Sequence, residues 1–244
     1  MQIFIYDTEK EIGQAAGKIF VDHVKANPNA AMGFATGMTP VPTYDYMAGE
    51  YEKGNVSFAG MKTFNLDEYC DLPREHKNSF YTFMMDNLFS RIDVKPENIN
   101  FLDGNAPDQS AESERYAQAI IDAGGIDVQF LGIGRNGHIA FNEPAGGFTG
   151  EAFKVKLTDS TIEANSIYFD DIAMPRYAMT MGIGSIMRAK KIVFVATGAS
   201  KAEAVKAMVQ GEVTPECPAS ILQTHDDVTV FLDRAASQGL GVRN

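Results

Sequence analysis

Phe130-Leu-Gly-Ile-Gly-Arg-Asn-Gly-His-Ile-Ala-Phe-Asn-Glu-Pro-Ala-Gly-Gly147 is the most informative stretch of the chain. The largely apolar residues 126–131, which lead into it, predict a buried strand. Three glycines follow among polar side chains, and Pro144 with the glycines beyond it stops a long helix from forming. A buried strand that ends in glycines and polar groups is typical of an α/β protein with its chemistry at the carboxyl end of that strand.

Two functions compete for this loop. Gly132, Gly134 and Gly137 match the G-x-G-x-x-G fingerprint of dinucleotide sites, but that motif needs a helix at its third glycine, and here a Pro/Gly-rich loop follows. In the alternative, the loop is catalytic. Its histidine at position 138 is suited to proton transfer near neutral pH, and Asn136 and Glu143 are close enough in sequence to orient it. We favour catalysis over a dinucleotide site or a purely structural loop.

Composition limits the classes of protein that the chain can represent. Its 244 residues suffice for one domain spanning 1–244, and 45% hydrophobic with 22% charged residues is ordinary for a globular protein. With 21 Lys and Arg against 32 Asp and Glu, the net charge is -11, which argues against nucleic acid as a partner. An anionic ligand would need a local positive potential, such as a helix start.

Cysteine usage and the absence of long apolar runs indicate a compartment. Cys70 and Cys217 form neither C-x-x-C nor zinc spacing and are expected to be free thiols. The first residues resemble a strand rather than a signal peptide, and no apolar run approaches membrane-spanning length. We expect a cytoplasmic protein without a membrane partner.

Segments with strand and helix periodicity alternate along the chain. We predict strands at 2–6, 30–35, 61–66, 99–102, 126–131, 177–181, 191–196 and 228–232, and helices at 9–27, 42–53, 78–89, 109–123, 183–187 and from about 201 to 210. This alternation predicts a doubly wound, mostly parallel, Rossmann-like α/β sheet. Residues 148–171 fit neither period and are expected to form an irregular, lid-like segment.

Two small-residue turns could bind an anion. Thr36-Gly-Met-Thr-Pro40 follows a predicted strand and precedes a helix, so its hydroxyls and backbone could cradle a ligand, although a simple capped turn is the alternative. Lys201 is expected in the first turn of a later helix, where the dipole disfavours a cation. A bound anion explains it best, and a flexible surface lysine is the alternative.

A pair of carboxylates, Asp67-Glu68, follows the third predicted strand and is expected in a loop. One of them could act as a general base, and a solvated acidic turn is the alternative. The three glycine-containing polar turns, at 36–40, 132–147 and 197–201, each follow a predicted strand, so they should collect at one edge of the sheet.

Six stretches of the chain are similar to one known family. They are Thr36-Gly-Met-Thr-Pro40, Phe64-Asn-Leu-Asp-Glu-Tyr69, Leu72-Pro-Arg-Glu-His76, Asp103-Gly-Asn-Ala-Pro107, Gly132-Ile-Gly-Arg-Asn-Gly-His-Ile-Ala-Phe-Asn-Glu-Pro144 and Thr197-Gly-Ala-Ser-Lys-Ala202. Together they resemble the glucosamine-6-phosphate deaminase/isomerase family over nearly the whole chain. The resemblance implies that D-glucosamine 6-phosphate and water give D-fructose 6-phosphate and ammonia, with a phosphorylated amino sugar as ligand and no metal or organic cofactor.

The resemblance also implies roles for individual residues. Asp67 resembles the base that moves a proton during enolisation, and His138 the group that assists ring opening. Asn136 and Glu143 resemble the pair that orients and tunes that histidine. The phosphate would lie on Lys201 and the turn of Thr36, Gly37, Met38 and Thr39. The chemistry is consistent with this, because an aldose–ketose shift needs a base and a ring-opening group, and a desolvated carboxylate has a raised pKa.

The chain departs from the family pattern at three places. Asn136 stands where many members have aspartate, which should weaken charge-based tuning but keep geometry. Ile167, within Ala164-Asn-Ser-Ile-Tyr168, stands where the family commonly places a phosphate-binding arginine. Phe148-Thr-Gly-Glu-Ala-Phe153 replaces a basic, serine-rich segment that forms an effector site in hexameric members. We therefore expect no activation by N-acetylglucosamine 6-phosphate, and a monomer or small homo-oligomer.

Other functions remain open on the sequence. The substrate could be galactosamine 6-phosphate, or the chain could be a phosphosugar lactonase of the same broad fold. A non-catalytic sugar-phosphate sensor would be consistent with the loss of the phosphate-binding arginine at position 167. A nicotinamide enzyme is the last alternative. A metal site of Asp67, His138 and Glu143 is disfavoured, because the spacing is not that of a zinc motif and one histidine is few.

Overall fold

A computed structural model describes residues 1–241, apart from the side chains of Ser160 and Ala164. Its main element is a seven-stranded sheet with the order β1-β10-β9-β6-β2-β3-β5, in which every neighbouring pair is parallel. The strands are β1 (Gln2–Tyr6), β2 (Ala31–Phe34), β3 (Lys62–Asn65), β5 (Ile99–Asn100), β6 (Val128–Leu131), β9 (Lys191–Ala196) and β10 (Val228–Asp233). The predicted doubly wound, mostly parallel sheet is confirmed.

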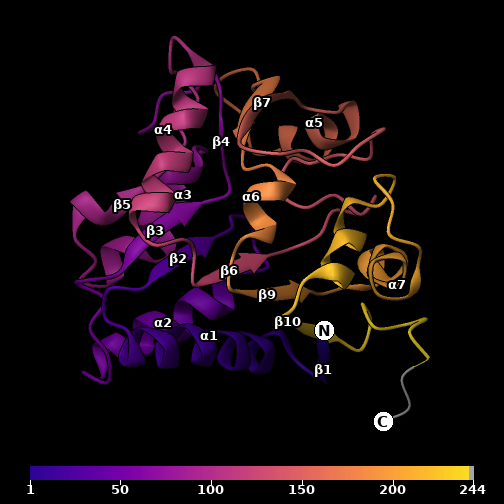
Figure 1. The fold of residues 1–244 in the computed structure, drawn as a ribbon, viewed down its shortest axis with the longest axis horizontal. Helices are drawn as coiled ribbons and strands as arrows, with labels where there is room; N and C mark the ends of the chain where they lie inside the picture. The colour runs from indigo at the N-terminus through magenta and orange to yellow at the C-terminus, as the bar shows by residue number, and fades with distance from the viewer. Residues whose placement is uncertain (242–244) are drawn as a thin grey trace.

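Helices connect these strands and cover the sheet. They are α1 (Glu9–Ala26), α2 (Val41–Glu52), α3 (Phe80–Asn87), α4 (Gln109–Asp122), α5 (Asp159–Ser166), α6 (Ile183–Met187) and α7 (Ala202–Gln210), with short 3-10 turns at Phe89–Arg91, Pro96–Asn98, Ala199–Lys201 and Pro218–Thr224. Figure 1 shows α1 and α2 along one side of the large sheet. They approach closely because Gly13 has no side chain: a Cβ there would lie 2.5 Å from Pro42.

The centre of the sheet is buried on both faces, so its strands show no alternation of polar and apolar residues. All four residues of β2 and of β6 are buried. The ring of Phe34 packs against those of Phe20 and Tyr44, with centroids 5.7 Å apart in each case. The ring centroid of Phe130 lies 6.3 Å from that of Phe20 and 6.3 Å from that of Tyr44. This is the expected pattern for a parallel sheet covered by helices.

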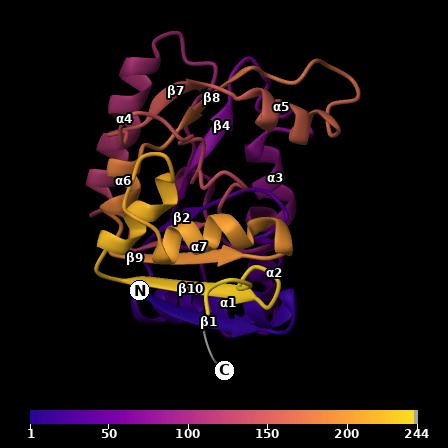
Figure 2. The ribbon, with the colours of Figure 1, turned by 90° about the vertical axis from the view of Figure 1, so that its right-hand side faces the viewer.

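A second sheet lies on the side of the large sheet away from α1 and α2, as two perpendicular views show (Figures 1 and 2). It is antiparallel with the order β4-β8-β7, formed by β4 (Asp67–Tyr69), β8 (Tyr177–Thr180) and β7 (Phe153–Lys156). The loop predicted for Asp67-Glu68 was therefore wrong. Pairing with the distant β8 makes this acidic tripeptide a strand, a tertiary effect that local propensity does not report.

The chain passes from one sheet to the other at a single residue. Leu66 donates its N–H to Phe34 O of the large sheet at 3.1 Å and accepts from Met181 N, just after β8, at 2.7 Å. β3 ends directly before Leu66 and β4 begins directly after it. The backbone hydrogen bonds that Leu66 makes to both sheets therefore fix the position of the next residue, Asp67.

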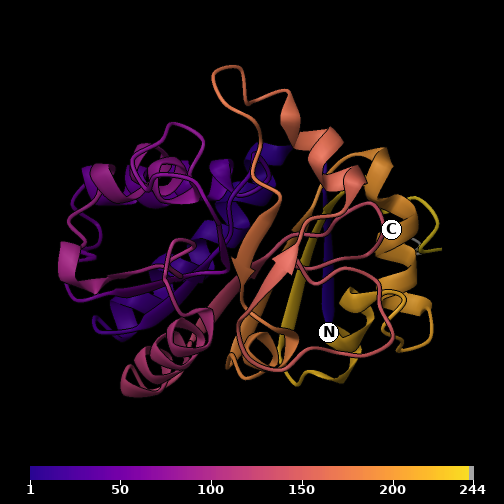
Figure 3. The ribbon, with the colours of Figure 1, turned by 90° about the horizontal axis from the view of Figure 1, so that it is seen from above.

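The segment 148–171 is not irregular as predicted, because it contains β7 and α5. Thr158 caps α5 by accepting from Thr161 N, and the residues after the helix are tied to the loop before α3. His76 Nε2 lies 3.3 Å from Asp171, Lys77 pairs with Asp170, and Asn78 donates to Tyr168 O at 2.7 Å. Seen from above, α5 lies along one edge of the molecule (Figure 3).

Within residues 1–241, no helix is long and apolar enough to cross a membrane.

Candidate active site

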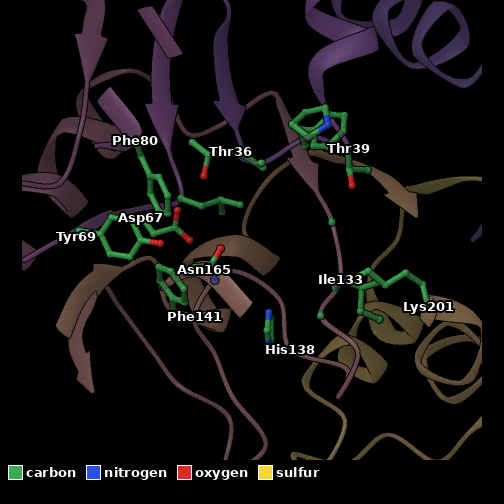
Figure 4. Close-up of a pocket in the computed structure, with 18 residues that line it drawn as sticks. Thr36, Thr39, Asp67, Tyr69, Phe80, Ile133, His138, Phe141, Asn165 and Lys201 are labelled. Carbon is green, nitrogen blue, oxygen red and sulfur yellow. The ribbon is translucent and has the colours of Figure 1, made fainter. Parts of the chain in front are cut away.

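A cavity of about 310 Å³ opens where β2 and β6 end and β4 begins. It is lined by parts of the turn after β2, the strand β4, the loop after β6 and the start of α7. Figure 4 shows side chains from these separate segments around the same space. The prediction that the polar segments after strands share one edge of the sheet is confirmed, and the volume is at the lower end of the range for small-molecule sites.

Asp67 lies in the wall that the small sheet contributes to the cavity. Only 7% of the residue is exposed, and its backbone pairs with Thr180 of β8. Burial raises the pKa of the Asp67 carboxyl to about 8, with a smaller contribution from the neighbouring charge of Glu68. A buried carboxylate with a pKa near neutrality is suited to accept and return a proton.

The Glu68 side chain points away from the cavity that Asp67 faces, because successive strand residues point to opposite sides. It does not line this cavity; its carboxylate accepts hydrogen bonds from the backbone N–H groups of Tyr69, Phe80 and Tyr81 at 2.9–3.0 Å. Phe80 and Tyr81 are the first two residues of α3, so these hydrogen bonds hold the amino end of that helix against β4. Burial raises the pKa of Glu68, and the three backbone donors oppose that rise.

The histidine loop is a tight turn that only glycine permits at two positions. Gly134 N donates to His138 O at 2.9 Å, and Gly137 N donates to Gly134 O at 3.1 Å. A Cβ on Gly134 would lie 2.3 Å from the His138 ring, and Gly137 has a φ of +87°. The glycine spacing therefore serves to place the imidazole against the loop backbone rather than to bind a dinucleotide.

His138 is oriented by the two residues that the sequence indicated. Its Nδ1 lies 3.2 Å from Glu143 Oε1, and its backbone N donates to Asn136 Oδ1 at 3.2 Å. Asn136 Nδ2 donates to the other Glu143 oxygen at 2.6 Å, and Thr161 of α5 donates to Oε1 at 3.0 Å. With Nδ1 directed at Glu143, the opposite nitrogen, Nε2, is available to a molecule in the cavity.

Glu143 is held as a carboxylate by its neighbours. Burial alone raises its pKa, but His138, Asn136 and Thr161 outweigh that effect and bring the pKa down to about 2. A fixed negative charge thus lies behind the imidazole. Across the described residues no three His, Cys, Asp or Glu side chains converge as a metal site requires, Asp67, His138 and Glu143 included.

The Thr36–Thr39 turn contributes most of its predicted members. Thr36, Gly37 and Thr39 line the cavity, and Gly37 adopts a φ of +94°, which favours glycine. Met38 does not line it, and its side chain is 72% exposed. Met38 is the central apolar residue of an exposed turn, so only its backbone can take part in a cradle.

Lys201 reaches the cavity from the other side. It is the N-cap residue of α7 rather than part of its first turn as predicted, because the preceding residues form a 3-10 turn. Its Nζ donates to Ile133 O at 2.7 Å, which leaves two of its three protons for other acceptors. Burial lowers the pKa of Lys201, and the positive charge of Arg135 lowers it further.

Among the lining residues that the sequence did not indicate are three aromatic residues and one amide. Tyr69, Phe80 and Phe141 form an aromatic wall, with ring centroids 4.5 Å apart for Tyr69 and Phe80 and 6.1 Å apart for Phe80 and Phe141. The amide, Asn165, lies in the segment expected to be irregular, whereas Ile167, two residues on, is 75% exposed and outside the lining.

Comparisons with known proteins show which family the chain resembles. The family model described as glucosamine-6-phosphate isomerases/6-phosphogluconolactonase matches residues 7–231. The chain is 44% identical to a glucosamine-6-phosphate deaminase of Clostridium botulinum (strain Alaska E43 / Type E3), covering 100% of this chain and 98% of that protein. It is 43% identical to glucosamine-6-phosphate deaminase 2 of Bacillus subtilis (strain 168), with 98% of each chain covered.

Solved structures extend the comparison. A structure described as a monomeric glucosamine-6-phosphate deaminase is 42% identical, has a TM-score of 0.93, and covers 97% of this chain and 99% of its own. A 6-phosphogluconolactonase from Trypanosoma cruzi, 18% identical with a TM-score of 0.79 and coverage of 99% and 97%, shares the fold. Since the family model spans residues 7–231 and these relatives match along their whole length, the chain belongs to the family of glucosamine-6-phosphate isomerases and 6-phosphogluconolactonases.

Proposed function

We propose that this protein converts D-glucosamine 6-phosphate and water to D-fructose 6-phosphate and ammonia. The observation that carries the proposal is that Asp67, buried with a raised pKa, and His138, backed by Glu143, face one cavity from segments of two different sheets. One group can then act at the ring oxygen while the other acts at adjacent carbons. The relatives at 42–44% identity are glucosamine-6-phosphate deaminases.

The first step is opening of the sugar ring. The phosphate is held by Lys201 and by the hydroxyls and backbone of the turn at Thr36, Gly37 and Thr39. His138, through Nε2, moves a proton from the anomeric hydroxyl to the ring oxygen, so that the bond between C1 and that oxygen breaks and an aldehyde forms. Glu143 and Asn136 fix the ring of His138 during this transfer, and the Glu143 charge favours the protonated imidazole that forms transiently.

The second step is the proton shift that Asp67 performs. Its carboxylate removes the proton from C2 of the open sugar and returns it to C1, which leaves an imine at C2. Water adds to C2, the amino group leaves as ammonia, and the ketone of fructose 6-phosphate remains. The aromatic wall of Tyr69, Phe80 and Phe141 keeps bulk water away from Asp67 and so sustains its raised pKa.

Ammonia release from glucosamine 6-phosphate tests the proposal, with galactosamine 6-phosphate run beside it. We expect turnover of the first sugar, and loss of activity by about 10²-fold or more in Asp67→Asn and His138→Ala, since each removes a proton-transfer group. Turnover of galactosamine 6-phosphate alone would change the substrate but keep the mechanism. Binding of both sugars without turnover would show a sugar-phosphate sensor instead.

We propose three further properties on separate grounds. The chain acts as one sugar-phosphate isomerase/deaminase domain, because both sheets contribute to the cavity. It works in the reducing cytoplasm, since Cys70 and Cys217 are buried free thiols. It is a monomer or a small homo-oligomer, as a relative of 42% identity is described as monomeric.

A further inference from the structure

The phosphate end of the cavity is short of positive charge. Of the described residues that line the cavity, Lys201 is the one lysine or arginine. A phosphate monoester carries about -1.5 to -2 charges near neutral pH, so one lysine leaves it incompletely neutralised. The exposed Ile167 at the end of α5 adds no charge from that side. A second cation should therefore lie close to Lys201.

Arg135 meets this requirement by its place in the histidine loop. It follows Gly134 in the turn that the Gly137 N–H to Gly134 O hydrogen bond closes, so its backbone is fixed. The Lys201 ammonium is bonded to the carbonyl of Ile133, only two residues before Arg135 in sequence. Arg135 does not itself line the cavity, but it directly follows Ile133 and Gly134, which do. The mutual repulsion of Arg135 and Lys201 contributes to the lowered pKa of Lys201.

Neither cation is neutralised by a carboxylate in the part of the chain that the structure describes. Arg135 is exposed and forms no ion pair there, and Lys201 is bonded to a neutral carbonyl. The nearest candidate acid in the loop, Glu143, is already engaged by His138, Asn136 and Thr161. Lys201 lines the cavity and Arg135 lies beside it, so the two cations repel each other, and an anion bound between them would relieve that repulsion.

We propose that Arg135 is the second cation of the phosphate site and closes onto the phosphate held by Lys201 and the Thr36–Thr39 turn. The planar guanidinium can donate two parallel hydrogen bonds to phosphate oxygens, which a lysine cannot. Arg135 is therefore a specificity residue that selects phosphorylated over free sugars. This inference rests on the proposed function, since it assigns the phosphate of that substrate to this end of the cavity.

The test compares Arg135→Ala with wild type and with Arg188→Ala. Arg188 is an exposed arginine paired with Glu151 at the end of α6, just before β9 begins and thus near the opposite edge of the large sheet. We expect Arg135→Ala to raise KM for glucosamine 6-phosphate by about 10- to 100-fold, the loss of one or two charge-assisted hydrogen bonds, with kcat little changed. Arg188→Ala should behave as wild type.

Two inhibitors separate phosphate binding from a general effect on the loop. Arg135→Ala should weaken competitive inhibition by inorganic phosphate as much as it raises KM, and leave inhibition by unphosphorylated glucosamine unchanged. An unaltered KM would overturn the inference, as would equal weakening of both inhibitors. If the wild type binds inorganic phosphate but turns over no amino sugar, the proposed reaction fails, and the phosphate affinity of the variant still decides the role of Arg135.

Discussion

The ionisation state of the buried Asp67 carboxyl affects both the activity of the protein and its stability. Its folded-state pKa is about 8, above the ordinary 3.8, so between these pH values the folded protein holds a proton that the unfolded chain has lost. The contribution of Asp67 to stability is thus present at acid pH and is lost as pH rises toward 8. The carboxylate that serves as base is also the one whose ionisation costs stability.

The substitution Asp67→Asn should separate these two effects. We expect the variant to be inactive and yet more stable than wild type at pH 8.5 by about 1–3 kcal/mol, the cost of an unpaired buried charge, with a smaller difference at pH 4.5. Thermal unfolding of both proteins at the two pH values measures this. A constant difference across the range would contradict the raised pKa. In wild type, kcat/KM should rise with pH toward a midpoint near 8.

Glu143 should affect the rate rather than binding, because it contacts the back of His138 and not the cavity. We expect Glu143→Gln to lower kcat about 10- to 100-fold with little change in KM, since it removes the charge that supports proton transfer but keeps a similar shape. Glu151→Gln, which affects an exposed carboxylate paired with Arg188, serves as the control. A change confined to KM would argue that Glu143 shapes the pocket instead.

The polar residues of the site were predictable from the sequence, whereas its walls were not. Asp67, His138, Asn136 and Glu143 stand next to strand ends and glycines, so their types and their places both indicated chemistry. Phe80 lies on α3, and an aromatic side chain on a helix usually belongs to the core. Its ring does pack against Tyr69, and only the tertiary structure reveals that the same ring also borders the cavity.

At the scale of secondary-structure elements, the contact between β4 and α3 depends on one carboxylate, that of Glu68. Glu68 accepts three backbone N–H groups that would otherwise lack a partner in a buried region. We expect Glu68→Ala to cost about 2–3 kcal/mol and to lower Tm by roughly 5–10 °C. Glu75→Ala, an exposed glutamate in the loop before α3, should leave Tm unchanged. An equally stable Glu68→Ala protein would show that water replaces the carboxylate.

Helix α5 offers a way to add charge to the site. Ile167 follows α5 directly and is 75% exposed, while Asn165 of the same helix lines the cavity. We expect Ile167→Arg to lower KM for the phosphorylated sugar by about threefold to tenfold at low salt, and less at high salt, because exposed charges are screened. KM measured at two ionic strengths, with Ile167→Gln as the uncharged control, tests this. Equal effects of both substitutions would exclude charge as the cause.

The elements of the large sheet were predictable because their signals are local. Thr8 and Glu11 form the capping box that begins α1, and Gly124 and Gly125 have positive φ where α4 stops. The small sheet was not predictable, since β4 and β7 are short and charged and exist through pairing with β8. Strands of three or four residues carry too little periodicity to stand out from loops.

The molecule as a whole should gain stability from its product. Fructose 6-phosphate without ammonia cannot react onward to the amino sugar, so it can occupy the site at equilibrium. At 100 times its Kd it should stabilise the fold by about 2.7 kcal/mol, a rise in Tm of roughly 5–10 °C. Thermal unfolding with and without the sugar phosphate measures the shift, and fructose is the control. A shift of the same size with fructose would mean that the phosphate adds nothing to binding.

The passage of the chain between its sheets at Leu66 has a consequence for insertions and deletions in this protein. Because side chains alternate along β4, inserting one residue after Leu66 would put the inserted residue in the register position of Asp67, turn Asp67 toward α3, and move Glu68 into the register position of Tyr69. Every atom needed for the reaction would still be present, yet the Asp67 carboxylate would no longer face the cavity. The length of the connection between β3 and β4 therefore matters for activity as much as the identity of the catalytic residues does, and evolution can act on either.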